Sequence, residues 1–272
     1  MSPDLTLAFH LADLADAMTL RWWSRNGVAS TAKADGSLVT EADVAAEEAV
    51  LSAVREARPG DGFLGEEVGE RMGTTGRRWI VDGIDGTRFF AAGLARWGSL
   101  IALEVAGEIV LGVTSSPAQD RRWWATRGEG AFTGRSKSRS TDIRIHVSTE
   151  RRLRPDRFIT LPAHGALPLH RQQIVEELGG GPPVDRPWSH ANRIAEGRAD
   201  VCVWFCGDIW DHAAPSILVE EAGGRFSDHS QTRKAPDTGL HDTFASNTSA
   251  FSDAWYRTFA ENRSMRPRVA PV

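Results

Sequence analysis

The sequence has few cysteines and no long apolar segment. Its two cysteines, Cys202 and Cys206, exclude the disulfide framework that stabilises many small secreted domains. The longest apolar stretch, residues 100–114, is interrupted by Glu104 and Glu108, so no segment is expected to span a membrane. The first residues also lack a basic stretch followed by an apolar one, which a signal peptide requires. These absences predict a cytoplasmic protein that has no membrane partner.

An excess of positive charge is also absent. The 32 Lys and Arg residues are outnumbered by 36 Asp and Glu residues, which gives a formal net charge of −4 at pH 7. Nonspecific binding to nucleic acids generally needs a basic surface, so nucleic acid is not an expected partner. Hydrophobic residues make up 41% of the 272-residue chain, which is typical of a globular protein with a sizeable core.

Helical and extended patterns alternate along the chain. Apolar residues at spacings of three and four predict a helix over residues 7–22, and a second helical pattern begins at Thr40. The apolar residues 79–81 predict a buried strand, whereas the polar and basic residues 133–142 predict a surface loop or a junction between lobes. The mixture of both patterns predicts an α/β fold with an α+β arrangement of layered sheets and helices.

Three acidic segments place carboxylates beside glycines or at the ends of predicted elements: residues 65–67, 79–87 and 210–224. A strand that ends at Asp82 and turns tightly can direct Asp82 and Asp85 into one cleft. Carboxylate oxygens without a cluster of histidines or cysteines suit a hard cation such as Mg²⁺. Gly86 and Thr87, which follow Asp85, offer backbone N–H groups of the kind that bind a phosphate oxygen.

Each acidic segment alone also has a structural explanation. Asp211 can cap a helix, Thr40 and Asp43 have the spacing of a capping box, and Glu66 can belong to an exposed acidic turn. Asp82 is harder to explain in this way, because a carboxylate at the end of a buried strand needs a partner. The combination of the segments therefore favours a functional site.

The order and spacing of these segments resemble the inositol monophosphatase family of metal-dependent phosphomonoesterases. The family pattern has a Gly-Glu-Glu element, a W-[IV]-[IV]-D-P-[IL]-D-G-T element and a W-D-x-A-A…E-A-G-G element. The likeness runs from Leu5 to Ser249. Within the family, the chain is most similar to the actinobacterial histidinol-phosphatases. The shared sequence segments are LADLADA, LVTEAD, RRWW and GAF. The resemblance implies the inositol-monophosphatase-like sugar phosphatase fold, with alternating α-β-α-β-α layers.

The resemblance also implies a set of metal ligands. Glu66, Asp82 and the carbonyl of Ile84 would hold a first Mg²⁺, and Asp82, Asp85 and Asp211 would hold a second. Glu66 would reach a weaker third ion through water. The expected cofactor is therefore two Mg²⁺ ions, or three when the weaker site is filled. Paired ions of this kind brace the attacking and leaving oxygens of an in-line displacement.

Phosphate and water would be bound by the turn that follows the ligands. By resemblance, Asp85, Gly86 and Thr87 form the phosphate-binding turn. Thr87, hydrogen-bonded to Asp43, would position the attacking water, so Asp43, Glu66 and Thr87 are the expected catalytic residues. With a metal at the leaving oxygen, no strong side-chain acid is required.

The chain departs from the family pattern at two backbone positions. Gly83 replaces the usual proline of the D-P-[IL]-D element, which predicts a less constrained turn and looser metal affinity. Pro215 stands where glycine is usual, at a position expected to lie in the first turn of a helix that starts near Asp211, where proline is tolerated.

The residues expected to contact the substrate alcohol depart further from the family pattern. Seven residues before Asp211, where the family commonly has a glutamate that contacts the alcohol, this chain has Trp204. The expected substrate-binding residues are Trp188, His190, Trp204 and Asp208. Two indoles favour a flat or apolar group, although both tryptophans can equally belong to the core.

The expected organisation is two lobes and a tail. Residues 1–142 would form an N-terminal lobe with the metal and phosphate motifs. Residues 143–262 would form a C-terminal lobe with the substrate-side residues and Asp211, and residues 263–272 would be a flexible tail. The resemblance also implies a homodimer.

The sequence thus predicts a Mg²⁺-dependent phosphomonoesterase acting on a small-molecule phosphate ester other than myo-inositol phosphate. Alternative substrates are histidinol phosphate, a sugar phosphate, or a nucleoside or aminonucleoside 5′-monophosphate of specialised metabolism. An alternative of another class is a non-catalytic regulatory or RNA-associated member of the family. The complete set of ligand-type residues argues against lost catalysis.

Overall fold

The computed structural model describes residues 1–34, 36–136, 138–152, 154–161, 169–177, 190–228 and 241–247. The predictions for Trp188 and for the tail at residues 263–272 lie outside the described residues. Within these ranges, no helix combines the length and the apolar character needed to cross a bilayer.

The described residues form six α-helices. Ser2 caps the first of them by accepting the N–H of Leu5 at 3.2 Å, and Pro3 occupies its first turn, where its missing N–H is not needed. The helices are α1 (Pro3–Trp22), α2 (Glu41–Ala57), α3 (Thr87–Ala91), α4 (Leu169–Glu177), α5 (His190–Ala195) and α6 (Ile209–Glu221).

The strands of the described residues form three sheets. A hairpin joins β1 (Thr31–Ala32) to β2 (Leu38–Val39). The largest sheet has eight strands, in the order β10 (Ser138–Ile145), β9 (Gly130–Arg135), β8 (Arg121–Thr126), β7 (Glu108–Ser116), β6 (Gly98–Val105), β5 (Arg77–Asp85), β3 (Gly62–Gly65) and β4 (Gly69–Arg71). The third has the order β11 (Phe158–Leu161), β12 (Val201–Gly207), β14 (His241–Ser246) and β13 (Arg225–Asp228). All strand pairs are antiparallel except β3–β5 and β11–β12.

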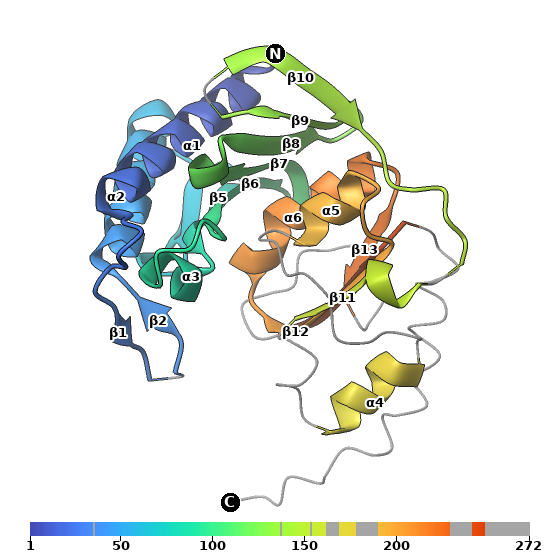
Figure 1. Cartoon of the computed structure of the whole chain (residues 1–272). Coiled ribbons are helices and arrows are strands. Elements are labelled where there is room, and N and C mark those ends of the chain that lie inside the picture. The colour runs from blue at the N-terminus through green and yellow to red at the C-terminus, as the bar shows by residue number, and fades with distance from the viewer. Residues whose placement is uncertain are drawn as a thin grey trace, which may run out of the picture.

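The elements stack in five layers, as the family resemblance implies (Figure 1). Helices α1 and α2 cover one face of the eight-stranded sheet, and α5 and α6 lie between the two larger sheets. On the outer face of the four-stranded sheet, Arg171 of α4 lies over the ring of Phe205 at 4.9 Å from its centroid. The resulting α-β-α-β-α order confirms the predicted fold class.

Alternation along β5 decides which side chains reach which layer. Trp79 and Val81 are buried against α1 and α2, whereas Ile80 is buried against α6. Successive side chains of a strand point to opposite faces, so Asp82 follows Ile80 toward α6. The strand sequence therefore places this buried carboxylate on the face where Asp211 lies.

Helix α6 contributes to both cores between the sheets. Ala213 and Ile217 pack with residues of the eight-stranded sheet, whereas Val219 packs with Phe226 and Ala245 of the four-stranded sheet. A helix that is apolar on more than one side must be covered on each of them. The two halves of the chain therefore share α6 as a common buried element.

The prediction of a surface loop at residues 133–142 was wrong. This segment belongs largely to β9 and β10, which pair with Thr133 opposite Ile143. Because β10 is an edge strand, one of its sides pairs with no other strand of the described residues, and polar or basic residues are usual there. Polarity alone therefore did not distinguish this strand from a loop. β10 ends at Ile145, three residues beyond the expected lobe boundary, and the division into lobes stays a prediction.

The position of Pro215 also differs from expectation. Helix α6 begins at Ile209 rather than near Asp211, so Pro215 is its seventh residue and lies beyond the first turn. Proline lacks the N–H that would bond the carbonyl of Asp211 four residues earlier. The helix nevertheless continues to Glu221.

Candidate active site

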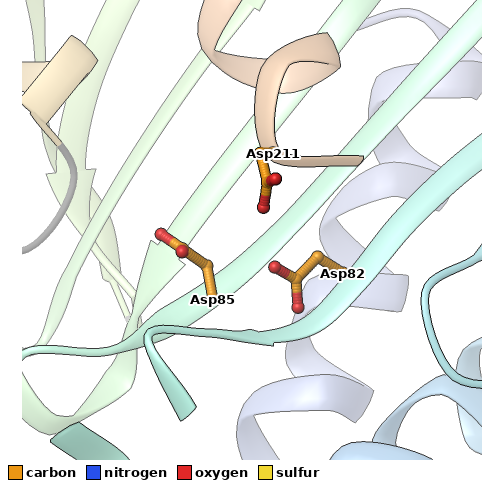
Figure 2. A group of neighbouring side chains, drawn as sticks. All are labelled: Asp82, Asp85 and Asp211. Carbon is orange, nitrogen blue, oxygen red and sulfur yellow. The ribbon is translucent and has the colours of Figure 1, made fainter. Parts of the chain in front are cut away.

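Three carboxylates converge between β5 and α6. One ligand oxygen from each of Asp82, Asp85 and Asp211 lies within 4.8 Å of the other two. Figure 2 shows the side chains of Asp82 and Asp85 on β5 and, above them, that of Asp211, which points down from the start of α6. These residues come from segments more than 120 positions apart in the sequence, which only the packing of α6 on the sheet brings together.

The turn after Asp82 is shaped by its own hydrogen bonds. Asp82 Oδ1 accepts the N–H of Ile84 at 2.9 Å, and the pairing of β5 with β6 shifts register between Asp82 and Asp85. Gly86 then adopts a left-handed conformation with φ of 85°, which favours glycine. The irregular strand end turns Asp85 toward Asp82 and begins α3 at Thr87.

The start of α6 orients Asp211. Asp211 is the third residue of the helix, and its Oδ2 accepts the N–H of Asp208, the N-cap residue, at 2.7 Å. This is the reciprocal bond of a capping box, which satisfies a helix-end donor and restrains the carboxylate. Asp211 therefore caps α6 and at the same time places its carboxylate beside that of Asp82.

The electrostatics of the cluster fit a divalent cation. Burial raises the pKa of Asp82 well above its usual range, and the nearby Glu66, Asp85 and Asp211 raise it further. Burial, followed by the charge of Asp85, raises the pKa of Asp211 to about 8. Like charges buried together are costly without a neutralising ion, and an all-oxygen donor set suits Mg²⁺. The residues present therefore fit the metal that the family resemblance implies.

Glu66 lies beside this cluster and is held by a lysine. Its Oε1 is 2.8 Å from Lys33 Nζ, and Lys33 also pairs with Glu67. Burial raises the pKa of Glu66 even though Lys33 acts in the opposite direction. Lys33 comes from the β1–β2 hairpin, and no local pattern in the sequence indicated that it would reach the site.

Thr87 and Asp43 form the contact that the resemblance implies. Thr87 Oγ1 lies 2.9 Å from Asp43 Oδ1 and 3.0 Å from the carbonyl oxygen of Ile84. Asp43 Oδ2 accepts the N–H of Thr40 at 2.9 Å and also its hydroxyl, which completes the capping box of α2. Burial raises the pKa of Asp43, while its Thr40 and Thr87 hydrogen bonds oppose that rise.

The predicted substrate-binding residues that the structure describes, His190, Trp204 and Asp208, lie in surroundings that differ from one another. Trp204 is half-buried, and its ring meets His212 edge-on at a centroid distance of 6.0 Å and Phe226 at 5.8 Å. His190 begins α5 and is half-buried, and Asp208 precedes α6. Trp204 therefore combines core packing with an exposed part, whereas the place of Trp188 lies outside the described residues.

Glu47 is a buried residue of this region that the sequence patterns did not single out. It lies one helical turn after Asp43, on the same face of α2. Its carboxylate accepts the backbone N–H groups of Glu67 and Val68 at 2.9 Å and 3.0 Å. Burial raises its pKa to about 7 against the effect of these hydrogen bonds. The spacing of four from Asp43 was the signal that could have found it.

The sequence profile of the inositol monophosphatase family matches residues 2–263, so the chain belongs to this family. The family is metal-dependent and its members act on small phosphate esters, and this chain is accordingly a phosphoric monoester hydrolase.

Two curated relatives illustrate the family resemblance. A histidinol-phosphatase of Streptomyces coelicolor is 38% identical over 258 residues, which cover 88% of this chain and 94% of that protein. A Streptomyces griseus protein named glucose-1-phosphate thymidylyltransferase is 39% identical over 238 residues, which cover 83% of this chain and 85% of that protein.

Among solved structures, the inositol monophosphatase of Thermotoga maritima superposes with a TM-score of 0.77 at 25% identity. The match covers 96% of this chain and all of that one. The fold and the family predicted from the sequence are therefore confirmed.

Proposed function

We propose that this chain is a Mg²⁺-dependent phosphomonoesterase that hydrolyses a small-metabolite monophosphate by an activated water. The observation that carries the proposal is the convergence of Asp82, Asp85 and Asp211 beside the Gly86-Thr87 turn. Asp82 and Asp85 on β5 with Asp211 on α6 are proposed as ligands, together with Glu66 and the carbonyl of Ile84. When bound, the ions would lower the pKa of a coordinated water and stabilise charge on the attacking and leaving oxygens.

Side chains and backbone groups of the chain would orient the attacking water and bind the phosphate. With the Ile84 carbonyl bound to the metal, the Thr87 hydroxyl donates its hydrogen bond to Asp43, so its lone pairs can accept a hydrogen bond from the attacking water. The N–H groups of Gly86 and Thr87 bind the phosphate oxygens. The water oxygen forms the new bond to phosphorus as the bond to the ester oxygen breaks; the water gives up one proton to solvent, and the leaving alcohol takes one from solvent.

For the alcohol, we propose a group with a planar or apolar part rather than a polyol. Trp204 stands where a carboxylate contacting the alcohol is expected, and its ring is half-buried beside His212. An indole offers one N–H donor and a large apolar face, but it accepts no hydrogen bonds from polyol hydroxyls. A nucleoside 5′-monophosphate fits this description.

Histidinol phosphate is the second candidate. The S. coelicolor relative is named for that activity and matches over nearly its whole length. Trp204 disfavours this substrate, because a carboxylate that would pair with the ammonium of histidinol is missing at that position. Asp208, which lies next to the carboxylate cluster, is the nearest candidate to replace it.

The test is release of inorganic phosphate with and without Mg²⁺. The panel contains a nucleoside 5′-monophosphate, histidinol phosphate, myo-inositol 1-phosphate and glucose 1-phosphate, the last because the name of the S. griseus relative contains it. We expect Mg²⁺-dependent turnover that is abolished by Asp82→Asn and by Asp211→Asn, with both variants folded by circular dichroism. Near-normal turnover of either variant at saturating Mg²⁺ would contradict the ligand assignment.

The same assay separates the enzyme from a regulatory or RNA-associated relative. If none of the esters in the panel releases phosphate, and Mg²⁺ leaves the stability of the protein unchanged, the non-catalytic alternative is favoured. The homodimer and the cytoplasmic location stay predictions, and sedimentation analysis tests the first of them.

A further inference from the structure

Glu47 is fully buried on α2, and its carboxylate bonds to backbone rather than to a cation. Oε2 accepts the N–H groups of Glu67 and Val68, and Oε1 accepts a longer bond of 3.4 Å from the N–H of Gly83. Among the residues that the structure describes, Glu47 forms no ion pair. A buried carboxylate is costly unless hydrogen-bonded, so these three donors explain how it is tolerated.

The three donors belong to two segments that carry proposed metal ligands: the loop that follows β3, and the irregular end of β5 after Asp82. Glu67 directly follows Glu66, and Gly83 directly follows Asp82. β3 and β5 are neighbouring parallel strands, and the last bond between them before these two segments runs from the N–H of Glu66 to the carbonyl of Val81 at 3.3 Å. Beyond that bond the ladder ends, and the carboxylate of Glu47 joins the two segments.

Two glycines leave the space that this carboxylate fills. A Cβ atom at Gly65 would collide with Glu47 Oε2. A Cβ atom at Gly83 would lie 2.9 Å from the carbonyl oxygen of Asp43 and 3.1 Å from Glu47 Cγ. Helix α2 therefore packs against the turn more closely than a side chain at position 83 permits.

Position 83 is where the family pattern has proline. Proline has no N–H, so it could not make the bond that Gly83 makes to Glu47. Its ring would also push against Asp43 and α2. In this chain the turn gains from hydrogen bonding and close packing the restraint that a proline ring would otherwise give.

We propose that Glu47 is a positioning residue that sets the Glu66 loop and the Asp82–Asp85 turn at the separation required for metal binding. The proposal rests on the metal site of the proposed function. Asp43, one turn earlier on the same helix face, holds Thr87. Helix α2 thus fixes the two ligand-bearing segments and the Thr87 hydroxyl from a single rigid element.

The test measures binding of Mn²⁺ alone, by electron paramagnetic resonance of the free ion, and thermal unfolding of each variant. Glu47→Gln keeps the side-chain volume, but its amide NH₂ faces one of the loop donors and cannot accept from it. We expect the Mn²⁺ Kd to rise by about 10–100-fold, the range usual for residues that orient metal ligands.

Asp16→Asn is the matched control. Asp16 is a buried carboxylate on α1, which packs on the same sheet face as α2, and it pairs with Arg122 at 2.7 Å and accepts the hydroxyl of Ser115. We expect this variant to unfold at a lower temperature but to bind Mn²⁺ with wild-type Kd. Equal weakening in Glu47→Gln and Asp16→Asn would mean that general loosening is responsible, and would overturn the proposal.

Gly83→Pro provides a second arm if Glu47→Gln does not fold. Although it restores the family residue, we expect it to weaken Mn²⁺ binding in this chain, because it removes a donor to Glu47 and displaces α2. Unchanged or tighter binding would overturn the proposal.

Asp82→Asn separates failure of this inference from failure of the proposed function. If Asp82→Asn binds Mn²⁺ as wild type does, the metal site itself is wrong. If Asp82→Asn loses binding while Glu47→Gln keeps the wild-type Kd, only the positioning role is wrong.

Discussion

Thr87 has a single hydroxyl proton and two acceptors within reach, Asp43 Oδ1 at 2.9 Å and the carbonyl oxygen of Ile84 at 3.0 Å. If the Ile84 carbonyl becomes a metal ligand, as proposed, Asp43 is left as the acceptor. The hydroxyl is then fixed in orientation, with its lone pairs turned away from Asp43. Its contribution is expected in the transition state rather than in substrate binding.

Thr87→Ala should therefore lower kcat by about 10²-fold or more while changing KM little, because the phosphate-binding N–H survives the substitution. Thr87→Ser, which keeps the hydroxyl, is the control and should retain most of the activity. Steady-state kinetics on the best substrate of the panel measures both. An unchanged kcat in Thr87→Ala would show that Thr87 is only a turn residue.

Trp204 shows how one residue can serve packing and recognition together. Part of its surface packs beside the core formed by α5, α6 and the four-stranded sheet, and the rest is exposed. A polyol donor left unpaired against the indole costs roughly 1–3 kcal/mol, which is about one to two decades in kcat/KM. A stacked base would instead gain about 1–3 kcal/mol.

Trp204→Glu is expected to raise kcat/KM for myo-inositol 1-phosphate relative to a nucleoside 5′-monophosphate by at least about one decade. Trp204→Leu, which keeps an apolar side chain, controls for lost packing and should not favour the polyol. Kinetics on both esters with all three proteins measures the ranking. A ranking that is the same in wild type and Trp204→Glu would assign Trp204 to the core alone.

At the scale of the element, the first turn of α2 serves as a cap and as part of the site. Asp43 accepts the N–H and hydroxyl of Thr40 through one oxygen and the hydroxyl of Thr87 through the other. Thr40 in turn accepts the N–H of Ala42 at 3.2 Å. The structural and functional explanations of the Thr40–Asp43 pattern are thus both satisfied by one carboxylate.

Thr40→Ala should lower the free energy of unfolding by about 1 kcal/mol, because it removes the N-cap oxygen. It should lower kcat less than Thr87→Ala does, since Asp43 keeps the N–H of residue 40 as a partner. Thr40→Ser is the control for both quantities. Denaturant unfolding and steady-state kinetics provide the measurements, and an equal loss of kcat in Thr40→Ala and Thr87→Ala would contradict this division of roles.

Sequence patterns predicted the elements whose signals are local. The apolar run ending at Asp82 marked β5, and the capping-box spacing marked the start of α2. Lys33 was missed because its ion pairs join a hairpin to a loop 33 residues later, and nothing local records that contact. β10 was missed because an edge strand and a surface loop can share the same polar composition.

The residues of the candidate site were likewise predictable only where their signals are local. Asp82, Asp85 and Asp211 could be singled out because each lies at a recognisable element end, and the family resemblance ordered them. The role proposed for Glu47 depends on backbone donors from two segments, which become neighbours only when β3 pairs with β5. Such contacts require the tertiary structure.

At the scale of the whole molecule, α6 links the two larger sheets and carries Asp211 at its first turn. A metal held by both Asp82 and Asp211 would connect β5 to α6 directly. Binding to the native state alone lowers the population of opened forms, and local opening is what exposes amides to exchange.

Addition of Mg²⁺ is therefore expected to slow hydrogen exchange in the first turn of α6 and in residues 82–87, while strands β8 and β9 change little. Hydrogen exchange followed by mass spectrometry, with and without Mg²⁺, measures this. Asp82→Asn is the control and should show no Mg²⁺-dependent protection. Protection spread evenly over the chain, or none at all, would argue against an ion bridging the two segments.

The place of α6 in the chain has a consequence for biosynthesis. A ribosome that has released residues 1–208 has supplied all eight strands of the large sheet and four of the five proposed ligand positions, but one face of that sheet still lacks α6, which supplies most of its helical cover. The next thirteen residues form α6 and bring both the missing apolar cover and Asp211. Burial of that face and completion of the ion site therefore coincide during translation, so an unfinished chain would have neither a closed core nor phosphatase activity.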